Sequence, residues 1–346
     1  MRARPRSRVR GACGGGPAGP PPDLRPAEAE DLDACAQVWR DSLADYLVRL
    51  NQPDILTDLG PIMRLFRHLL ATDPSLFWVA TRPTADPADR RPPGARGERI
   101  VGFGSANVRG RAWFLALLFV VPGEQGRGTG ARLLDRTLPP GVRPHGGALD
   151  GGWTFGTATD SAQPISNALY ARYGLVPRVP FLHLTGEVRR PEAFPGLPLT
   201  IEPSAFDELA GDGRPVLTAA IEAIDRELLG YTHPEDHGYL EAEGRVGILY
   251  RDREGNALGY GYTSRVGRVG PVAARDASLL PAMLGHLLAA VRPAGAFSTW
   301  VPGAAGGAVA ALLDAGLRLE SFPALHCWDR PSVDDSRYIP ISLALL

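Results

Sequence analysis

The sequence predicts a mixed α/β protein made of two similar halves, each a mostly antiparallel sheet flanked by helices. Over residues 23–185, segments with the apolar spacing of strands alternate with segments that have the apolar spacing of helices. This alternation predicts one unit in which helices pack on a sheet. After a polar, proline-rich stretch the same order begins again. Both halves also close alike, because Leu169–Leu175 and Ala311–Leu317 stand 142 residues apart and both end on Gly-Leu.

In the first half, strand and helix patterns follow a short basic segment. Residues 1–22 carry five arginines and no acid before a run of Gly and Pro, which predicts a disordered tail. Order begins with a short strand at Asp23. The expected helices cover 28–49, 59–71, 128–137 and 164–173. The expected strands cover 77–81, 100–108, 113–121, 153–158 and 176–184, with a polar loop over 82–98.

The second half repeats this order after a linker. We predict a first domain over 23–187, a linker over 188–198, a second domain over 199–330 and an apolar C-terminal tail over 331–346. The expected helices cover 216–229, 278–291 and 307–315. The expected strands cover 199–203, 246–250, 257–263, 269–273 and 296–301. The tail is expected to pack on the sheet or in the partner of a homodimer.

Composition excludes several function classes. The 37 basic residues are all arginine, since the sequence contains no lysine, which excludes a lysine Schiff base and the phosphate-binding loop that ends in Gly-Lys. The formal charge of −1 argues against nucleic-acid binding. The three cysteines lack metal-ligand spacing, and no apolar run approaches the roughly 18 residues of a membrane span. We therefore expect a cytoplasmic protein with no membrane partner and no secretory signal.

A glycine-rich loop carries the clearest chemical signal. Gly126, Gly128 and Gly130 follow an apolar strand and open a helix, where unpaired first-turn N–H groups favour a bound phosphate. The same glycines, with Asp150 about 20 residues on, also satisfy a dinucleotide-binding pattern. That pattern should follow the first strand of a βαβ unit, and here four expected strands precede it.

Two motifs resemble those of the GNAT N-acetyltransferase superfamily. Gln125, Gly128 and Gly130 match its acetyl-CoA signature, Gln or Arg, two residues, Gly, one residue, Gly or Ala. Asn167–Leu175 is similar to a second signature, with Leu175 in place of phenylalanine. The resemblance implies two tandem GNAT-like domains, each with a V-shaped opening between central parallel strands.

The second copy departs from the family pattern. It has no glycine loop after Ala274, and Val309 and Leu312 stand where Asn167 and Tyr170 stand in the first copy. We interpret it as a degenerate copy that packs on the first domain's site or completes it.

The resemblance implies an enzyme that transfers an acetyl group from acetyl-CoA to a primary amine, with Tyr170 as general acid. It implies cofactor contacts from the strand end, the glycine loop and the following helices: Phe119, Val120, Val121, Gln125, Gly126, Arg127, Gly128, Thr129, Gly130, Ala131 and Asn167. The amide of Val121 is expected to polarise the thioester carbonyl. The strand expected over 113–121 contains no Asp, Glu or His. The candidates for the general base are therefore Asp160, His183, Glu124 or a water chain to solvent.

Several interpretations stay open. The acceptor is expected to be a small amine; the alternatives are a non-catalytic acyl-CoA-binding sensor and an acetyltransferase for a peptide or protein amine. Trp39, Tyr46 and Phe66 lie on helices that wall the acceptor pocket in this family, although core packing explains most of them. His233-Pro-Glu-Asp-His237 groups metal-ligand side chains, but Pro234 and Gly238 favour a solvated turn or a substrate lid. We therefore predict no metal.

Overall fold

The computed structural model describes residues 20–52, 58–84, 98–142, 152–331 and 333–346. Nearly all of the predicted N-terminal tail and most of the loop predicted over 82–98 lie outside them. No helix of the described segments combines the length and apolar character that a bilayer span needs. Within these residues the chain is a mixed α/β fold, as the sequence predicts, with two sheets.

The first half contains the helices and strands that the sequence predicts. Its strands are β1 (Asp23–Pro26), β2 (Phe77–Pro83), β3 (Glu98–Arg109), β4 (Ala112–Val120), β5 (Thr154–Asp160) and β6 (Val176–Gly186). Its helices are α1 (Leu32–Arg49), α2 (Gly60–Thr72), α3 (Thr129–Thr137) and α4 (Pro164–Arg172). The apolar run of β4 is buried over most of its length, because helices cover the central strands on both faces.

The second half adds elements that the sequence patterns do not predict. Its strands are β7 (Ile201–Ala205), β8 (Val246–Asp252), β9 (Ala257–Thr263), β10 (Val269–Ala274), β11 (Phe297–Pro302), β12 (Arg318–Leu319), β13 (Ala324–Trp328) and β14 (Tyr338–Ile339). Its helices are α5 (Arg214–Leu228), α6 (Pro234–Ala242), α7 (Leu280–Ala290) and α8 (Gly306–Asp314). The unpredicted elements are α6, β12, β13 and β14.

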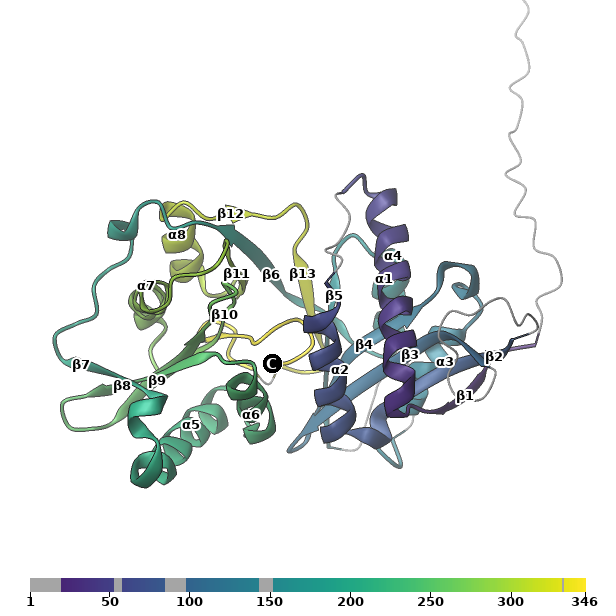
Figure 1. Cartoon of the computed structure of the whole chain (residues 1–346), viewed down its shortest axis with the longest axis horizontal. Helices are drawn as coiled ribbons and strands as arrows, with labels where there is room; N and C mark the ends of the chain where they lie inside the picture. The colour runs from purple at the N-terminus through teal and green to yellow at the C-terminus, as the bar shows by residue number, and fades with distance from the viewer. Residues whose placement is uncertain (1–19, 53–57, 85–97, 143–151, 332) are drawn as a thin grey trace, which may run out of the picture.

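The two halves exchange strands. The larger sheet runs β1-β2-β3-β4-β5-β13-β6-β11, so β13 of the second half lies between two strands of the first. The first residues of β6, Val176–Phe181, pair with β13, and its last residues, Phe181–Gly186, pair with β11. In Figure 1, β6 and β13 accordingly lie where the green-to-yellow half meets the purple-to-blue half. The larger sheet therefore contains strands from both sides of the predicted linker over 188–198.

Both halves contain a place where neighbouring parallel strands separate. In the first half, β4 and β5 pair only over Ala112–Leu115 and Thr154–Thr157. In the second half, the corresponding β10 and β11 retain one isolated parallel bridge, between Arg268 and Ser298. There β14 pairs with β10 on the free side, so the chain's own C-terminal segment fills the second opening.

The exchanged strand β13 packs against the first half through one close approach. A Cβ added to Gly156 of β5 would overlap the Trp328 indole, which is buried at 2% exposure. Gly156→Ala is therefore expected to lower the free energy of unfolding by about 1–3 kcal/mol, measured by urea denaturation. Gly196→Ala is the matched control, because a Cβ there meets nothing within 4 Å. Equal stability of the two variants would contradict this packing.

Candidate active site

A cavity of about 430 Å³ lies where β4 and β5 separate, and we call it the splay cavity. Side chains from α1, α4 and β5 line it together with the C-terminal segment of the chain. Its lining includes Trp39, Tyr46, Asp160, Gln163, Tyr170 and Ala344. Two of the three aromatic residues expected near the acceptor thus reach a cavity, whereas the third, Phe66, is a fully buried core residue.

The glycine loop joins β4 to α3 beside this cavity. Gly126 has φ 73° and Gly128 has φ 82°, a region that residues with a Cβ rarely adopt. A Cβ at either position would meet nothing within 4 Å, so backbone conformation rather than space requires glycine. Gln125 Nε2 donates to the carbonyl of Val120 (2.8 Å) and anchors the loop to the strand end. The loop thus presents the N-terminus of α3, which begins at Thr129, as a potential anion site.

The register of β4 differs from the expectation for Val121. Its N–H donates to the Val101 carbonyl (3.0 Å), so this amide is already paired within the sheet. Backbone groups alternate sides along a strand, which directs those of Phe119 toward β3 as well. The amides of Leu118 and Val120 then face the splay cavity. The Val121 amide is therefore not available to polarise a carbonyl, and that expectation is wrong. The amide of the preceding residue, Val120, is the one that faces the cavity.

The other residues implied to contact the cofactor surround the α3 N-terminus. Arg127 lies 3.9 Å from Glu124, and a Cβ at Gly130 would pack against Leu169 at 3.7 Å. Asn167 Nδ2 donates to the carbonyls of Asp160 (3.0 Å) and Gln163 (2.7 Å). These bonds fix the side chain, while its buried Oδ1 has no partner among the described residues. An amide donor of a ligand would satisfy that acceptor.

Two hydroxyls lie near the α3 N-terminus. Thr129 Oγ1 is buried and has no hydrogen-bond partner in the described segments. Ala131 lies two residues further along α3, and its carbonyl accepts from the Tyr173 hydroxyl at 3.4 Å. The hydroxyl of α4's C-cap residue thus contacts the first turn of α3, while that of Thr129 has no partner among the described residues.

Tyr170 lines the splay cavity from α4 and is only 5% exposed. Burial is the main cause that raises the pKa of its phenol well above the ordinary value; Cys327 of β13 adds to it, and a hydrogen bond with Ser166 opposes it. The phenol is therefore protonated at neutral pH, as a proton donor must be.

The structure separates the candidate bases. Glu124 accepts two hydrogen bonds from Arg82, at 2.7 and 2.9 Å, and this ion pair holds the pKa of its carboxyl below the usual value. Glu124 is thus committed to Arg82, while Asp160 lines the splay cavity. His183 lines a neighbouring cavity, and burial lowers the pKa of its imidazole, which favours the neutral, proton-accepting form.

A second cavity, of about 720 Å³, lies between the two halves, and we call it the junction cavity. It shares lining residues with the splay cavity, among them Trp39 and Trp300. Trp300 of β11 stacks on the His183 ring, with centroids 4.2 Å apart. Charged side chains from both halves line it: Asp58, Glu243, Arg245, Arg268 and Glu320. Residues of both halves therefore line the junction cavity, and Trp300 of the second half also lines the splay cavity.

The segment His233–His237 is not a solvated turn, and that prediction is wrong. Pro234 occupies the first turn of α6, where its missing N–H costs nothing, and His233 precedes it as the N-cap. His233, Asp236 and His237 are 0%, 2% and 8% exposed. In Figure 1, α6 lies beside α2 at the junction of the halves. Tertiary burial, rather than local sequence, decides the state of this segment.

The comparisons with known proteins give the fold. No family model and no curated protein matches the sequence. A candidate acetyltransferase from Pyrococcus horikoshii superposes with a TM-score of 0.65 at 15% identity, covering 94% of this chain and 95% of that one. A GCN5-related N-acetyltransferase from Sphaerobacter thermophilus gives 0.54 at 16% identity, covering 91% and 98%.

A third solved structure is a region of a larger protein. A GCN5-related glucosamine N-acetyltransferase region of a fungal multi-domain β-N-acetylglucosaminidase gives a TM-score of 0.52 at 14% identity, covering 90% of this chain and 38% of that one. The first two structures are matched over nearly their whole length, so the likeness includes both halves. At these identities it shows a shared fold.

Proposed function

From the tandem fold of the GNAT N-acetyltransferases, we propose that this chain transfers an acetyl group from acetyl-CoA to the primary amine of a small molecule. One observation carries the proposal: β4 and β5 separate beside a glycine loop that opens a helix, and Tyr170 faces the resulting cavity. Among the described residues, no strand fills the opening between β4 and β5 in the first half, whereas β14 pairs with β10 at the corresponding opening of the second half. The active copy is therefore the first.

The donor would lie along the free side of β4. Its pyrophosphate would accept hydrogen bonds from amides of Gln125–Ala131, where the α3 dipole favours negative charge. Its pantetheine arm would pair with the backbone of Leu118 and the N–H of Val120, as an added strand would, while the Val120 carbonyl already accepts from Gln125 and Ser42. The unpartnered Oδ1 of Asn167 supports an amide contact with the same arm.

The acceptor would enter from the junction cavity. That cavity shares Trp39, Trp300 and Ser342 with the splay cavity, which supports a route from the junction to the thioester. Its volume of about 720 Å³ is typical of a small-molecule site. Direct attack within two adjoining pockets would need the chain chiefly to hold both reactants in line.

Proton transfer completes the reaction. A neutral amine attacks the thioester carbon, the C–S bond breaks, and Tyr170 gives its proton to the departing thiolate. The nitrogen, which becomes positively charged on attack, loses its extra proton to Asp160 or His183, directly or by water, and a proton returned from that base or from solvent restores the Tyr170 phenol. Because burial lowers the pKa of His183, this imidazole is unprotonated at neutral pH and able to accept it.

Calorimetry with acetyl-CoA tests the donor site. We expect saturable binding, weakened about tenfold by Gly128→Ala. The loop of the free variant would leave the left-handed region, and binding would have to return residue 128 to it at a cost of about 1–2 kcal/mol. Gly123→Ala is the matched control in the same loop: a Cβ there meets nothing within 4 Å, and affinity should change less than about twofold. Circular dichroism of both variants checks their fold.

Release of free CoA with a panel of small amines then tests catalysis. Turnover with a small amine supports the proposal. Acetyl-CoA binding without CoA release in the presence of any small amine, peptide or protein amine would favour a non-catalytic acyl-CoA sensor. Turnover with peptide or protein amines alone would show that the acceptor is not a small molecule. Absence of acetyl-CoA binding contradicts the donor site itself.

A further inference from the structure

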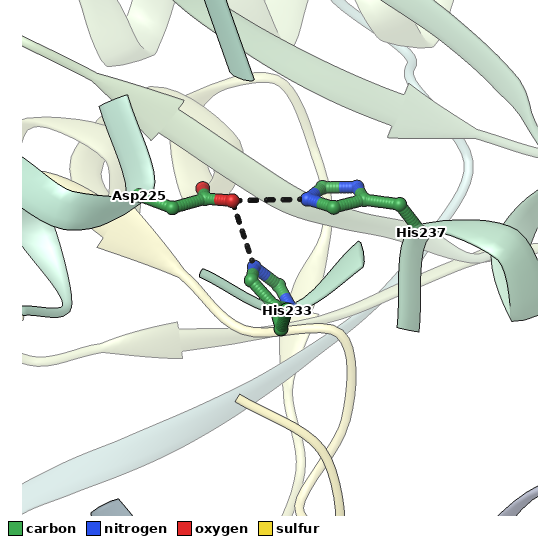
Figure 2. Close-up of side chains that lie close together, drawn as sticks. All are labelled: Asp225, His233 and His237. Carbon is green, nitrogen blue, oxygen red and sulfur yellow. Dashed lines mark hydrogen bonds and ion pairs between the residues drawn. The ribbon is translucent and has the colours of Figure 1, made fainter. Parts of the chain in front are cut away.

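A buried group of three ligand-type side chains lies in the second half, and none of the three lines the splay cavity or the junction cavity. Asp225 of α5, His233 before α6 and His237 on α6 are 1%, 0% and 8% exposed. Their nearest ligand atoms all lie within 4.8 Å of one another. Figure 2 shows both imidazoles directed at one carboxylate oxygen of Asp225. From this arrangement we propose a structural zinc-type divalent-cation site formed by these three residues.

The distances suit a common metal ion. Asp225 Oδ2 lies 3.1 Å from His237 Nε2 and 3.4 Å from His233 Nε2. Ligands at about 2.0–2.1 Å from a tetrahedral zinc ion stand about 3.3 Å apart, which matches both edges. The helical i, i+4 spacing of the two histidines places them on one face, so the backbone presents them together. Three protein ligands leave one position for a water molecule.

His233 supplies an independent sign of a missing ligand. Its side chain is fully buried, and neither ring nitrogen has a hydrogen-bond partner among the residues that the structure describes. A buried imidazole without a hydrogen bond is costly, and its nearest carboxylate oxygen on the Nε2 side, Asp225 Oδ2, lies at 3.4 Å; coordination of a metal ion through Nε2 would satisfy that nitrogen. Its Nδ1 lies 3.5 Å from Asp236 Oδ2, close enough for that carboxylate to orient the ring.

The other two ligands already have orienting partners. His237 Nδ1 lies 2.9 Å from the Tyr262 hydroxyl, while Nε2 hydrogen-bonds with Asp225 Oδ2 at 3.1 Å, a contact that a metal ion between the two atoms would replace. The Tyr260 hydroxyl donates to Asp225 Oδ1, and Oδ2 is the oxygen that faces both imidazoles. Partners of this kind hold metal ligands in the correct orientation, and here each ligand has one.

The charge of the surroundings also favours a dication. Asp73, Asp225 and Asp236 are all buried, and Arg109 is the guanidinium that contacts two of them. Three carboxylates and one guanidinium leave two excess negative charges among these four groups. Burial of uncompensated charge is unfavourable, and one divalent cation would remove the excess.

Metal analysis of the full-length chain, produced with zinc in the medium and without a polyhistidine tag, tests the site. We expect about one zinc per chain after dialysis, a fall in Tm on chelation and its recovery on adding ZnCl₂. Substituted Co²⁺ should give the visible absorption of a four-coordinate ion. Acetyl-CoA is absent, so the result does not depend on the proposed transferase activity.

Variants locate the ligands. Asp225→Asn and His237→Gln should reduce bound zinc at least tenfold, whereas Tyr262→Phe should keep one zinc at saturation with 10–100-fold weaker affinity. His286→Gln is the control, because His286 contacts Tyr250 outside the group. A wild-type chain that binds neither zinc nor Co²⁺, with Tm unmoved by chelator, would overturn the proposal and leave a protonated His233 between two carboxylates. Since that result needs no variant, failed folding of a variant cannot obscure it.

Discussion

Tyr170→Phe is expected to lower kcat by about 10²–10⁴-fold while the Kd for acetyl-CoA changes less than about twofold. The variant removes only the hydroxyl from a ring of α4 that is 5% exposed and belongs to the same core cluster as Cys327 of β13. The proton donor to the thiolate acts in the transition state, so its loss affects turnover and leaves donor binding intact. Single-turnover CoA release and calorimetry measure the two quantities separately.

Tyr173→Phe is the matched control for that experiment. Tyr173 follows the same helix, is 8% exposed, and donates from its hydroxyl to Asp135 Oδ1 (2.7 Å) rather than facing the splay cavity. Loss of this hydrogen bond should cost about 1 kcal/mol of stability and leave kcat within about threefold. If Tyr170→Phe and Tyr173→Phe have equal kcat, Tyr170 is not the proton donor.

The sequence predicts most first-half elements because their signals are local. The 3.6-residue spacing of α1 and the apolar run of β4 each specify an element without reference to distant residues. The glycines at 126 and 128 are likewise local, since positive φ itself requires them. The position of Val121 was not predictable to one residue, because the register between β3 and β4 shifts at Ser105 and Ala106.

The strand exchange has no local signal. β13 is five residues long, and its partner residues lie about 170 residues earlier in β5 and about 150 residues earlier in β6. An apolar pentapeptide can fit either half, so its place depends on the whole assembly. The fit of Trp328 over Gly156 becomes visible only once the two strands are side by side.

The prediction of a solvated turn at His233–His237 is wrong for a related reason. Pro234 and Gly238 are ordinary loop residues, yet proline is suited to a first helical turn and a single helical glycine costs only about 1 kcal/mol. Partners outside the segment outweigh that cost. His68 of α2 lies 2.7 Å from Asp236, and Arg109 of β3 contacts the same carboxylate. None of these contacts follows from the local pattern.

Arg109→Met is expected to lower the free energy of unfolding by about 3–5 kcal/mol, measured by urea denaturation. Its guanidinium is 6% exposed and holds two buried carboxylates, Asp73 at 2.9 Å and Asp236 at 2.8 and 3.0 Å. Asp73 belongs to the first half and Asp236 to the second, so this residue joins the halves electrostatically. Methionine fills a similar volume but leaves both buried carboxylates without the cation, which is the costly arrangement.

Arg214→Met provides the comparison, because Arg214 also makes a close two-oxygen contact with a carboxylate. Its Nη2 lies 2.7 and 2.8 Å from the oxygens of Glu241, but the two side chains are 49% and 38% exposed. Solvent screens this pair, so its loss should cost less than about 1 kcal/mol. Losses of similar size for Arg109→Met and Arg214→Met would contradict a buried ionic link between the halves. A clearly larger loss for Arg109→Met within one cooperative transition would show that β6, β13 and this ionic contact unfold together, as expected when strands from both halves form one sheet.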